Sequence, residues 1–236
     1  NAIGLQNVGL KKFLKEKLPY LRNFDTKVIV NILGKSVQEY VRLARALDET
    51  GVDGIELNVS CPNVKKGGMA FGTDQRSLAK LVGAVKQASG ATVVITKLSP
   101  NVSSIPVFAR AAEDAGSNAI SLINTIPALS IDIETRKSKL ANVTGGLSGP
   151  AIKPIALRMV WEASQAVSIP VIGIGGILNA SDAIEFLLAG ASAVQVGTGN
   201  FLNPRATSEI IEGLAAYLQR KNIHTVRDII GGIRAA

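Results

Sequence analysis

The sequence predicts an α/β protein whose parallel β-sheet closes into an eight-stranded (β/α)8 TIM barrel. Short, almost continuously apolar segments alternate with amphipathic helical segments, and strands of that composition are buried on both faces of a parallel sheet. No Gly-x-Gly-x-x-Gly turn follows the first of these segments, which makes a doubly wound, dinucleotide-type sheet the weaker alternative. The length agrees, because single barrels routinely reach the 236 residues of this chain.

The first strand–helix unit illustrates the pattern. Residues 27–33 have the apolar composition of a strand, and residues 36–50 carry an apolar stripe at helical spacing. Ser36, followed three residues later by Glu39, is a capping-box signature at the start of this helix. Gly51 is the expected terminator of the same helix.

Five further units repeat this alternation along the chain. The expected strands cover residues 54–59, 92–98, 118–124, 170–174 and 193–197. The expected helices cover residues 74–89, 103–115, 151–166, 179–189 and 204–221. Between them, residues 125–149 are predicted to be a long polar loop that makes a short excursion over the barrel mouth.

The count of units bears on the domain organisation. Residues 1–7 have the pattern of a strand end and loop, and six units fall short of the eight strands of a standard barrel. We therefore expect an upstream segment of about two strands before Asn1. Because no linker or internal repeat is visible, we expect residues 1–236 to form a single, N-terminally incomplete domain.

Composition narrows the function classes. The net charge of +8 raises the question of nucleic acid, but the basic residues are scattered and aromatic residues make up only 4% of the chain. Solvated helix faces and an anionic small ligand explain the charge better. A single cysteine excludes an internal disulfide framework and suits the cytoplasm. With no signal-peptide pattern and no membrane-length apolar run, we expect no membrane partner.

Polar residues stand at the ends of four predicted strands, where barrels of this class place their active sites. For any one asparagine the cap of a turn is the simpler explanation, but four strands together favour a site. Lys97 on an apolar strand must find a partner or lose its proton, so it is either a structural ion pair or a cation that faces a ligand. These residues are Asn31, Asn58, Lys97, Asn124 and Thr125.

The chain's only cysteine, Cys61, lies three residues after Asn58. A thiol at a strand end can act as a base or as a nucleophile, and the side chains of Asn58 and Asn63 can bind a planar ligand that carries amide groups. The only histidine, His224, lies far from these motifs and receives no role. No cluster has metal-ligand spacing, so we expect no metal.

Glycine-rich turns follow the last two predicted strands, at residues 173–177 and 197–199. Exposed backbone N–H groups near helix starts bind phosphate, and the last two βα loops of such barrels are a common phosphate site. The alternative for each turn is a tight connection without a ligand. A third glycine-rich segment at residues 145–150 either wraps a ligand's ring or ribityl-like chain, or starts the next helix.

Taken together, these segments resemble the dihydroorotate dehydrogenase family. The resemblance runs through essentially the whole chain and rests on residues 1–7, 58–63, 97–100, 124–125, 145–154, 173–177 and 196–198. It implies a TIM barrel that binds FMN and oxidises (S)-dihydroorotate to orotate in pyrimidine biosynthesis. It also implies that Cys61 is the base that removes the substrate's C5 proton while hydride leaves C6 for flavin N5.

The same resemblance implies the binding residues. Those implied for the substrate are Asn1, Gly4, Leu5, Asn58, Asn63, Asn124 and Thr125. Those implied for FMN are Asn31, Asn58, Lys97, Ser148, Gly149, Gly175, Gly176, Gly197 and Thr198, of which the last four would hold the phosphate.

Class and partners are implied as well. Cysteine at position 61 is similar to the class 1 enzymes, and residues 65–72 are similar to class 1B. Class 1B implies a homodimer of catalytic subunits, joined into a heterotetramer by an electron-transfer subunit that carries FAD and a 2Fe–2S cluster and reduces NAD⁺. The alternatives are a class 1A enzyme that uses fumarate, a related flavin-dependent dihydropyrimidine dehydrogenase, a flavin-free phosphosugar-binding barrel, and a non-catalytic scaffold subunit.

Overall fold

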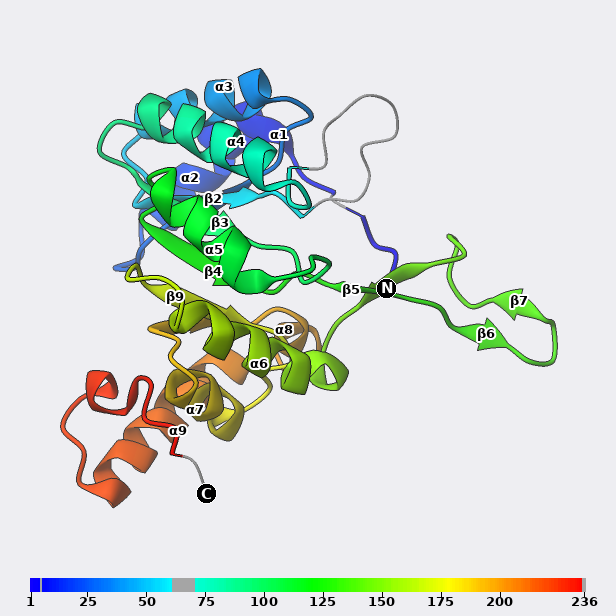
Figure 1. The fold of residues 1–236 in the computed structure, drawn as a ribbon, viewed down its shortest axis with the longest axis vertical. Coiled ribbons are helices and arrows are strands. Elements are labelled where there is room, and N and C mark those ends of the chain that lie inside the picture. The colour runs from blue at the N-terminus through cyan, green and yellow to red at the C-terminus, as the bar shows by residue number, and fades with distance from the viewer. Residues whose placement is uncertain (5, 61–70, 235–236) are drawn as a thin grey trace.

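The computed structural model of the chain describes residues 1–4, 6–60 and 71–234. Its centre is one six-stranded parallel sheet in the order β1-β2-β3-β4-β9-β10 (Figure 1). The strands are β1 (Ile29–Ile32), β2 (Gly54–Asn58), β3 (Val93–Lys97), β4 (Ala119–Leu122), β9 (Val171–Ile174) and β10 (Ala193–Gln195). Every predicted strand is therefore present, one to three residues shorter at its ends.

Strand order decides between the two predicted architectures. Each strand pairs with the next strand of this sheet along the chain, and the order never reverses. A doubly wound sheet has a reversal at its switch point, so that alternative is wrong and the barrel-type winding is confirmed. The sheet is also curled, because Gln195 on β10 donates a hydrogen bond to Glu56 on β2 at 2.9 Å, across the three strands that lie between them.

Helices follow the strands and pack against one another in sequence, as Figure 1 shows for α3, α4 and α5. They are α3 (Val37–Asp48), α4 (Gln75–Ala88), α5 (Ile105–Asp114), α6 (Lys153–Ser164), α7 (Ala180–Leu188) and α9 (Ala206–Lys221). Their apolar stripes supply fully buried side chains such as Leu47, Leu81 and Phe186. The hydrophobic core thus lies between the sheet and these helices, which leaves the concave face of the sheet for polar groups.

Helix caps agree in part with the sequence. Ser36 accepts a hydrogen bond from the N–H of Glu39 at 3.2 Å, as predicted. The Glu39 carboxylate instead accepts from the N–H of Lys35 at 2.8 Å, so the expected reciprocal bond to Ser36 is replaced by one a residue earlier. Gly51 has φ +68°, a left-handed conformation that suits the residue after a helix.

The N-terminal region contains helical structure that the sequence analysis did not predict. After residues 1–4, the chain forms three consecutive helical segments, α1 (Gly9–Lys12), η1 (Phe13–Lys17) and α2 (Leu18–Leu21), with a π-type turn in the middle one. Leu18 is buried, and Leu10, Phe13 and Leu14 pack against the core. The short helices α8 (Thr198–Leu202) and η3 (Val226–Ile229) were also not predicted, whereas η2 (Pro150–Ile152) forms the start of the predicted helix 151–166.

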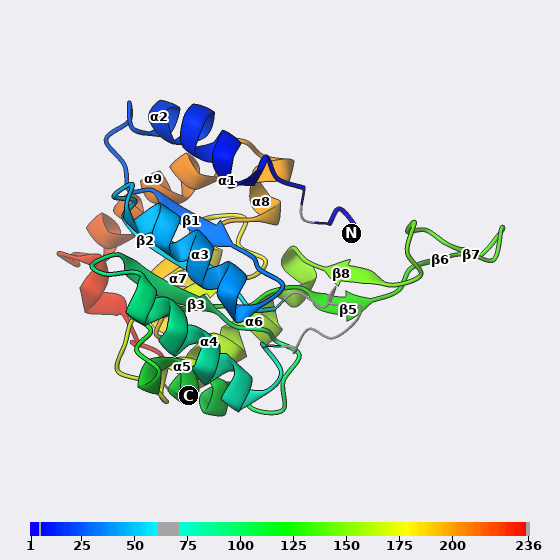
Figure 2. The same ribbon diagram turned by 90° about the horizontal axis from the view of Figure 1, so that it is seen from above.

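The segment predicted as a polar loop is instead an antiparallel β-arm. Strands β5 (Ile126–Ala128) and β8 (Gly145–Leu147) form its base, and β6 (Ile131–Asp132) and β7 (Lys137–Ser138) form its outer part. Figures 1 and 2 show the arm projecting away from the sheet, so the expected excursion over the mouth is wrong. Asp132 accepts hydrogen bonds from the N–H groups of Glu134 and Thr135 and closes the outer turn.

Candidate active site

Polar side chains line up across the carboxyl ends of three neighbouring strands. Asn58 on β2 is the register partner of Lys97 on β3, and Lys97 is the register partner of Ser121 on β4. Because register partners point to the same face of a sheet, all three side chains lie on the concave face. Asn124, just beyond β4, donates to Oδ1 of Asn58 at 3.3 Å. The structure therefore brings Asn58, Lys97 and Asn124 together, as the sequence predicted.

The end of β2 is held by a residue of helix α3. The hydroxyl of Tyr40 on α3 donates to the backbone carbonyl of Asn58 at 2.7 Å, and both residues are buried. In addition, the hydroxyl of Ser60 donates to the carbonyl of Lys97 at 3.1 Å. These bonds fix the backbone on which the two side chains stand.

Glu56 lies on β2, two residues before Asn58 and on the same face of the sheet, and it is only 4% exposed. It accepts hydrogen bonds from Nδ2 of Asn31 at 2.5 Å, from the hydroxyl of Ser121 at 2.7 Å and from Nε2 of Gln195 at 2.9 Å. The sequence analysis named Asn31 but missed Glu56, Ser121 and Gln195. One signal was available: Glu56 is an acidic residue in an apolar strand, two residues before Asn58 and so on the same face.

Lys97 is the cation of the site. Burial lowers the pKa of its ammonium, and the negative charge of Glu56 opposes that effect. Within residues 1–4, 6–60 and 71–234, Lys97 forms no salt bridge, so the structural ion pair considered from the sequence is not formed there. A charge held in this way is costly to bury and is available to an anionic ligand.

The first residue of the chain lies beside the base of the arm. The terminal amine of Asn1 donates to the carbonyl of Gly146 at 2.8 Å, and Nδ2 of Asn1 donates to the hydroxyl of Ser148 at 3.3 Å. Thr125 lies against the same strand, because a Cβ at Gly146 would stand 2.6 Å from the Thr125 hydroxyl. Gly4 has φ +80° and open space around it. Asn1, Thr125 and Ser148 are thus neighbours.

Three predicted glycine turns meet at the far side of the site. The hydroxyls of Thr198 and Ser148 are 3.0 Å apart. A Cβ at Gly176, where φ is +76°, would stand only 2.7 Å from the carbonyl oxygen of Gly149. Gly175 precedes it with φ +140°. By contrast, a Cβ at Gly197 would meet nothing within 4 Å. The turns therefore lie close to one another, and the space beside Gly197 is open.

Three predicted site residues, Leu5, Cys61 and Asn63, lie outside the described residues. Among the residues that are described, no group of three or more histidine, cysteine, aspartate or glutamate side chains could hold a metal ion. No helix in the described part of the chain has the length and apolar character needed to cross a membrane.

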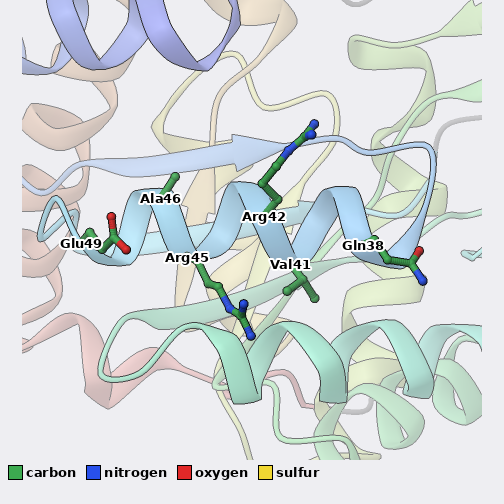
Figure 3. A pocket seen from close by; sticks show the side chains of 6 residues that line it. All are labelled: Gln38, Val41, Arg42, Arg45, Ala46 and Glu49. Atoms are coloured by element: carbon green, nitrogen blue, oxygen red, sulfur yellow. The ribbon is translucent and has the colours of Figure 1, made fainter.

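Two surface hollows lie away from this site. One, of about 460 Å³, is lined by residues of α3 and by Glu49, the C-cap of this helix (Figure 3). Its side chains diverge, with Arg42 directed toward β1 and Arg45 toward α4. The other, of about 380 Å³, lies between α6 and α7 and is lined by apolar residues such as Leu157, Trp161 and Leu188. Neither contains a predicted site residue, so the candidate site is the one at the carboxyl ends of the strands.

Comparisons with known proteins show which family this chain is similar to. A family model described as "Dihydroorotate dehydrogenase" matches residues 1–218. A relative from Geotalea daltonii is 54% identical over 235 residues, which is 99% of this chain and 77% of the relative. Relatives from Thermoanaerobacter pseudethanolicus and Caldicellulosiruptor bescii are 54% and 53% identical, over 99% of this chain and 77% of each relative. All three are named "Dihydroorotate dehydrogenase B (NAD(+)), catalytic subunit".

The electrostatics predict that Lys97→Met stabilises the protein when no ligand is bound. Because the pKa of Lys97 is lowered in the folded state, its charged ammonium destabilises the folded state at pH values below that pKa. This destabilisation is lost as the pH rises through that pKa. We expect the melting temperature at pH 7 to rise by about 2–4 °C, equivalent to about 1 kcal/mol in a chain of this size. The gain should shrink toward alkaline pH.

Lys153→Met is the matched control, since this lysine is paired with Asp182 at 2.7 Å and with Glu185 at 2.8 Å. Its hydrogen bonds to these carboxylates raise its pKa, so its contribution to stability is present at pH 7 and is lost only as the pH rises through that raised pKa. Lys153→Met should therefore lower the melting temperature at pH 7. If both substitutions lowered it equally, the electrostatic assignment of Lys97 would be wrong.

Proposed function

The chain belongs to the dihydroorotate dehydrogenase family, and we propose that residues 1–236 form an FMN-binding domain that oxidises (S)-dihydroorotate to orotate. Its relatives are named as NAD⁺-type catalytic subunits, which supports electron transfer to NAD⁺ rather than to fumarate. One structural observation carries the proposal: the amide and lysine row and the three glycine turns meet at the carboxyl edge of one sheet, where barrel enzymes bind their substrates.

The residues present suit FMN. The open space at Gly197 and the close approach of the turns at Gly149 and Gly176 form a cradle of backbone and hydroxyl groups, which is the chemistry that binds phosphate. In this proposal Ser148 and Gly149 contact the ribityl chain, and Gly175, Gly176, Gly197 and Thr198 hold the phosphate. When bound, FMN supplies a hydride acceptor.

Asn31, Asn58 and Lys97 would hold the ring system of the cofactor. The two amides supply donors and acceptors to its polar edge. The ammonium of Lys97, half-buried and without a salt bridge in the described residues, would stabilise negative charge that develops on the ring during the reaction.

The substrate would lie in the polar row itself. Asn58 and Asn124, already joined by a hydrogen bond, can reorient to donate to and accept from the amide groups of a dihydropyrimidine ring. Asn1 and Thr125, neighbours of Ser148, would complete the pocket together with Gly4, Leu5 and Asn63. Cys61 would remove the C5 proton, because a carbon acid beside a carbonyl group needs a base.

We further propose that the protein works as a homodimer joined to a partner subunit that carries FAD and a 2Fe–2S cluster. The relatives' printed name, "catalytic subunit", supports a partner. The β-arm exposes Leu129, Ile131, Ile133 and Val143, and apolar side chains gathered on one projecting element are typical of protein–protein contacts.

The base assignment predicts the behaviour of Cys61 variants. Cys61→Ala should retain bound FMN and lose most of its turnover, whereas Cys61→Ser should keep a remnant. A free thiol has a pKa of about 8.5, so the rate with dihydroorotate should rise from pH 6 toward pH 9 as the thiolate forms. Steady-state rates with each variant check this, and wild-type turnover by Cys61→Ala, or a flat profile, would refute the role.

A pair of glycine variants tests the phosphate cradle. Gly176→Ala combines a left-handed φ with a clash against Gly149, so it should lower the melting temperature as well as the affinity for FMN. Gly197 has φ −100° and open space in place of a side chain, so Gly197→Ala should fold normally and still weaken FMN binding by about tenfold or more, equivalent to about 1.4 kcal/mol.

Flavin fluorescence titration and thermal melting of both variants separate the two effects. Full FMN affinity in Gly197→Ala would show that the phosphate does not occupy the space beside this glycine.

The electron acceptor is tested by reconstitution. With the proposed FAD-containing partner subunit added, dihydroorotate should reduce NAD⁺, and the catalytic chain alone should do so at most slowly. Fumarate should not substitute for NAD⁺. Rapid turnover with fumarate in the absence of any partner would favour the fumarate-dependent alternative and overturn the NAD⁺ assignment.

A further inference from the structure

Glu56 is a buried carboxylate that none of the roles above uses. An ionised carboxylate costs several kcal/mol to bury unless it is fully paired, and this one lies in a strand whose other residues are buried as well. Its carboxylate accepts hydrogen bonds from donors on three different strands: Asn31 on β1, Ser121 on β4 and Gln195 on β10. A residue held in this way is either a brace for the curled sheet or part of the site above it.

The direction of these hydrogen bonds favours the site. A carboxylate can only accept, so Glu56 forces Asn31 and Gln195 to turn their amide nitrogens toward it. Their carbonyl oxygens are thereby left as the groups available to a ligand. A neutral residue that could both donate and accept would allow either amide to flip, and the site would lose a fixed pattern of acceptors.

Position in the sheet points the same way. Glu56 lies two residues before Asn58 on the same strand face. Ser121, which donates to Glu56, is the register partner of Lys97. Among the described residues, Glu56 is also the charged group whose field acts on Lys97. The carboxylate of Glu56 therefore lies next to the row of amide and lysine side chains, and it is this row that the proposed FMN ring would contact.

We propose that Glu56 is a positioning residue of the cofactor site, which fixes the amide orientation of Asn31 and Gln195 and supplies the counter-charge of Lys97. Gln195 thereby becomes a further residue whose carbonyl oxygen faces the ligand side of the network. This proposal rests on the proposed FMN-dependent function and adds to it two residues, Glu56 and Gln195.

The test compares Glu56→Gln with Ser121→Ala in the purified protein, with FMN as the probe. Glu56→Gln keeps the volume of the side chain but removes its charge and turns one acceptor into a donor. Ser121→Ala removes one hydrogen bond to the same carboxylate and leaves the charge and both amides in place. Melting temperature and the FMN dissociation constant, from quenching of flavin fluorescence, are measured for each at several pH values.

We expect Ser121→Ala to lower the melting temperature and to change FMN affinity less than threefold. Glu56→Gln should weaken FMN binding at least tenfold at pH 7. Its affinity should also decline at a lower pH than that of the unsubstituted protein, because Lys97 without its counter-charge loses its proton sooner. In the double variant Glu56→Gln/Asn31→Ala, the loss should be smaller than the product of the two single losses, since Glu56 acts partly through Asn31.

A brace without a positioning role would give a different result. Glu56→Gln would then lower the melting temperature while FMN affinity and its pH profile stayed within twofold of the unsubstituted protein, and the proposal would be overturned. If Glu56→Gln does not fold, FMN affinity is measured for Gln195→Leu instead, because Gln195 is half-buried on the edge strand β10. Loss of FMN affinity at least fivefold supports the proposal, and unchanged affinity overturns it.

The same measurements distinguish failure of the proposed function from failure of the positioning role of Glu56. Failure of the unsubstituted protein to bind FMN would overturn both the proposed function and the role of Glu56. Tight FMN binding that is indifferent to Glu56→Gln would leave the proposed function standing and remove only the positioning role.

Discussion

The site depends on the parallel register of the sheet. Because every pair of neighbouring strands is parallel and in sequential order, all carboxyl ends lie at one edge, and groups far apart in the sequence meet there. Asn58 and Asn124 are brought within hydrogen-bond distance in this way. So are Glu56 and Gln195, which are 139 residues apart. The apolar core between sheet and helices keeps that edge in place, and the polar groups of the site lie on the concave face.

The polar groups on the concave face of the sheet set the electrostatics of the site. Glu56 is satisfied by donors from three strands, and Lys97 remains without a salt bridge in the described residues. The two charges therefore act differently. The carboxylate of Glu56 orients neighbouring protein groups, and the ammonium of Lys97 can pair with a ligand. The glycine turns at 148–149, 175–176 and 197–198 lie close to one another, with Lys153 packed against Gly176.

Much of this could be predicted from local pattern. Hydrophobic periodicity found all six strands and the six helices that follow them, and the strand ends pointed to Asn31, Asn58, Lys97 and Asn124. The β-arm was missed because its short strands, such as Gly145–Leu147, lack an alternating apolar pattern. Gln195 was missed because its hydrogen bond to Glu56 crosses the sheet, which no local window contains. For Glu56 the only local signal was an acidic residue in an apolar strand, and it was not used. The predictions for Leu5, Cys61 and Asn63 fall outside the described residues and stay predictions.

If the polar row at the carboxyl edge binds a dihydropyrimidine against a flavin, as we propose, the substrate must reduce that flavin directly. The most direct measurement is the visible spectrum of the purified protein under anaerobic conditions as dihydroorotate is added. We expect a flavin absorption band that bleaches with dihydroorotate and persists with dihydrouracil, which lacks the carboxylate. A colourless protein that takes up no FMN, or a flavin band unchanged by excess dihydroorotate, would contradict it.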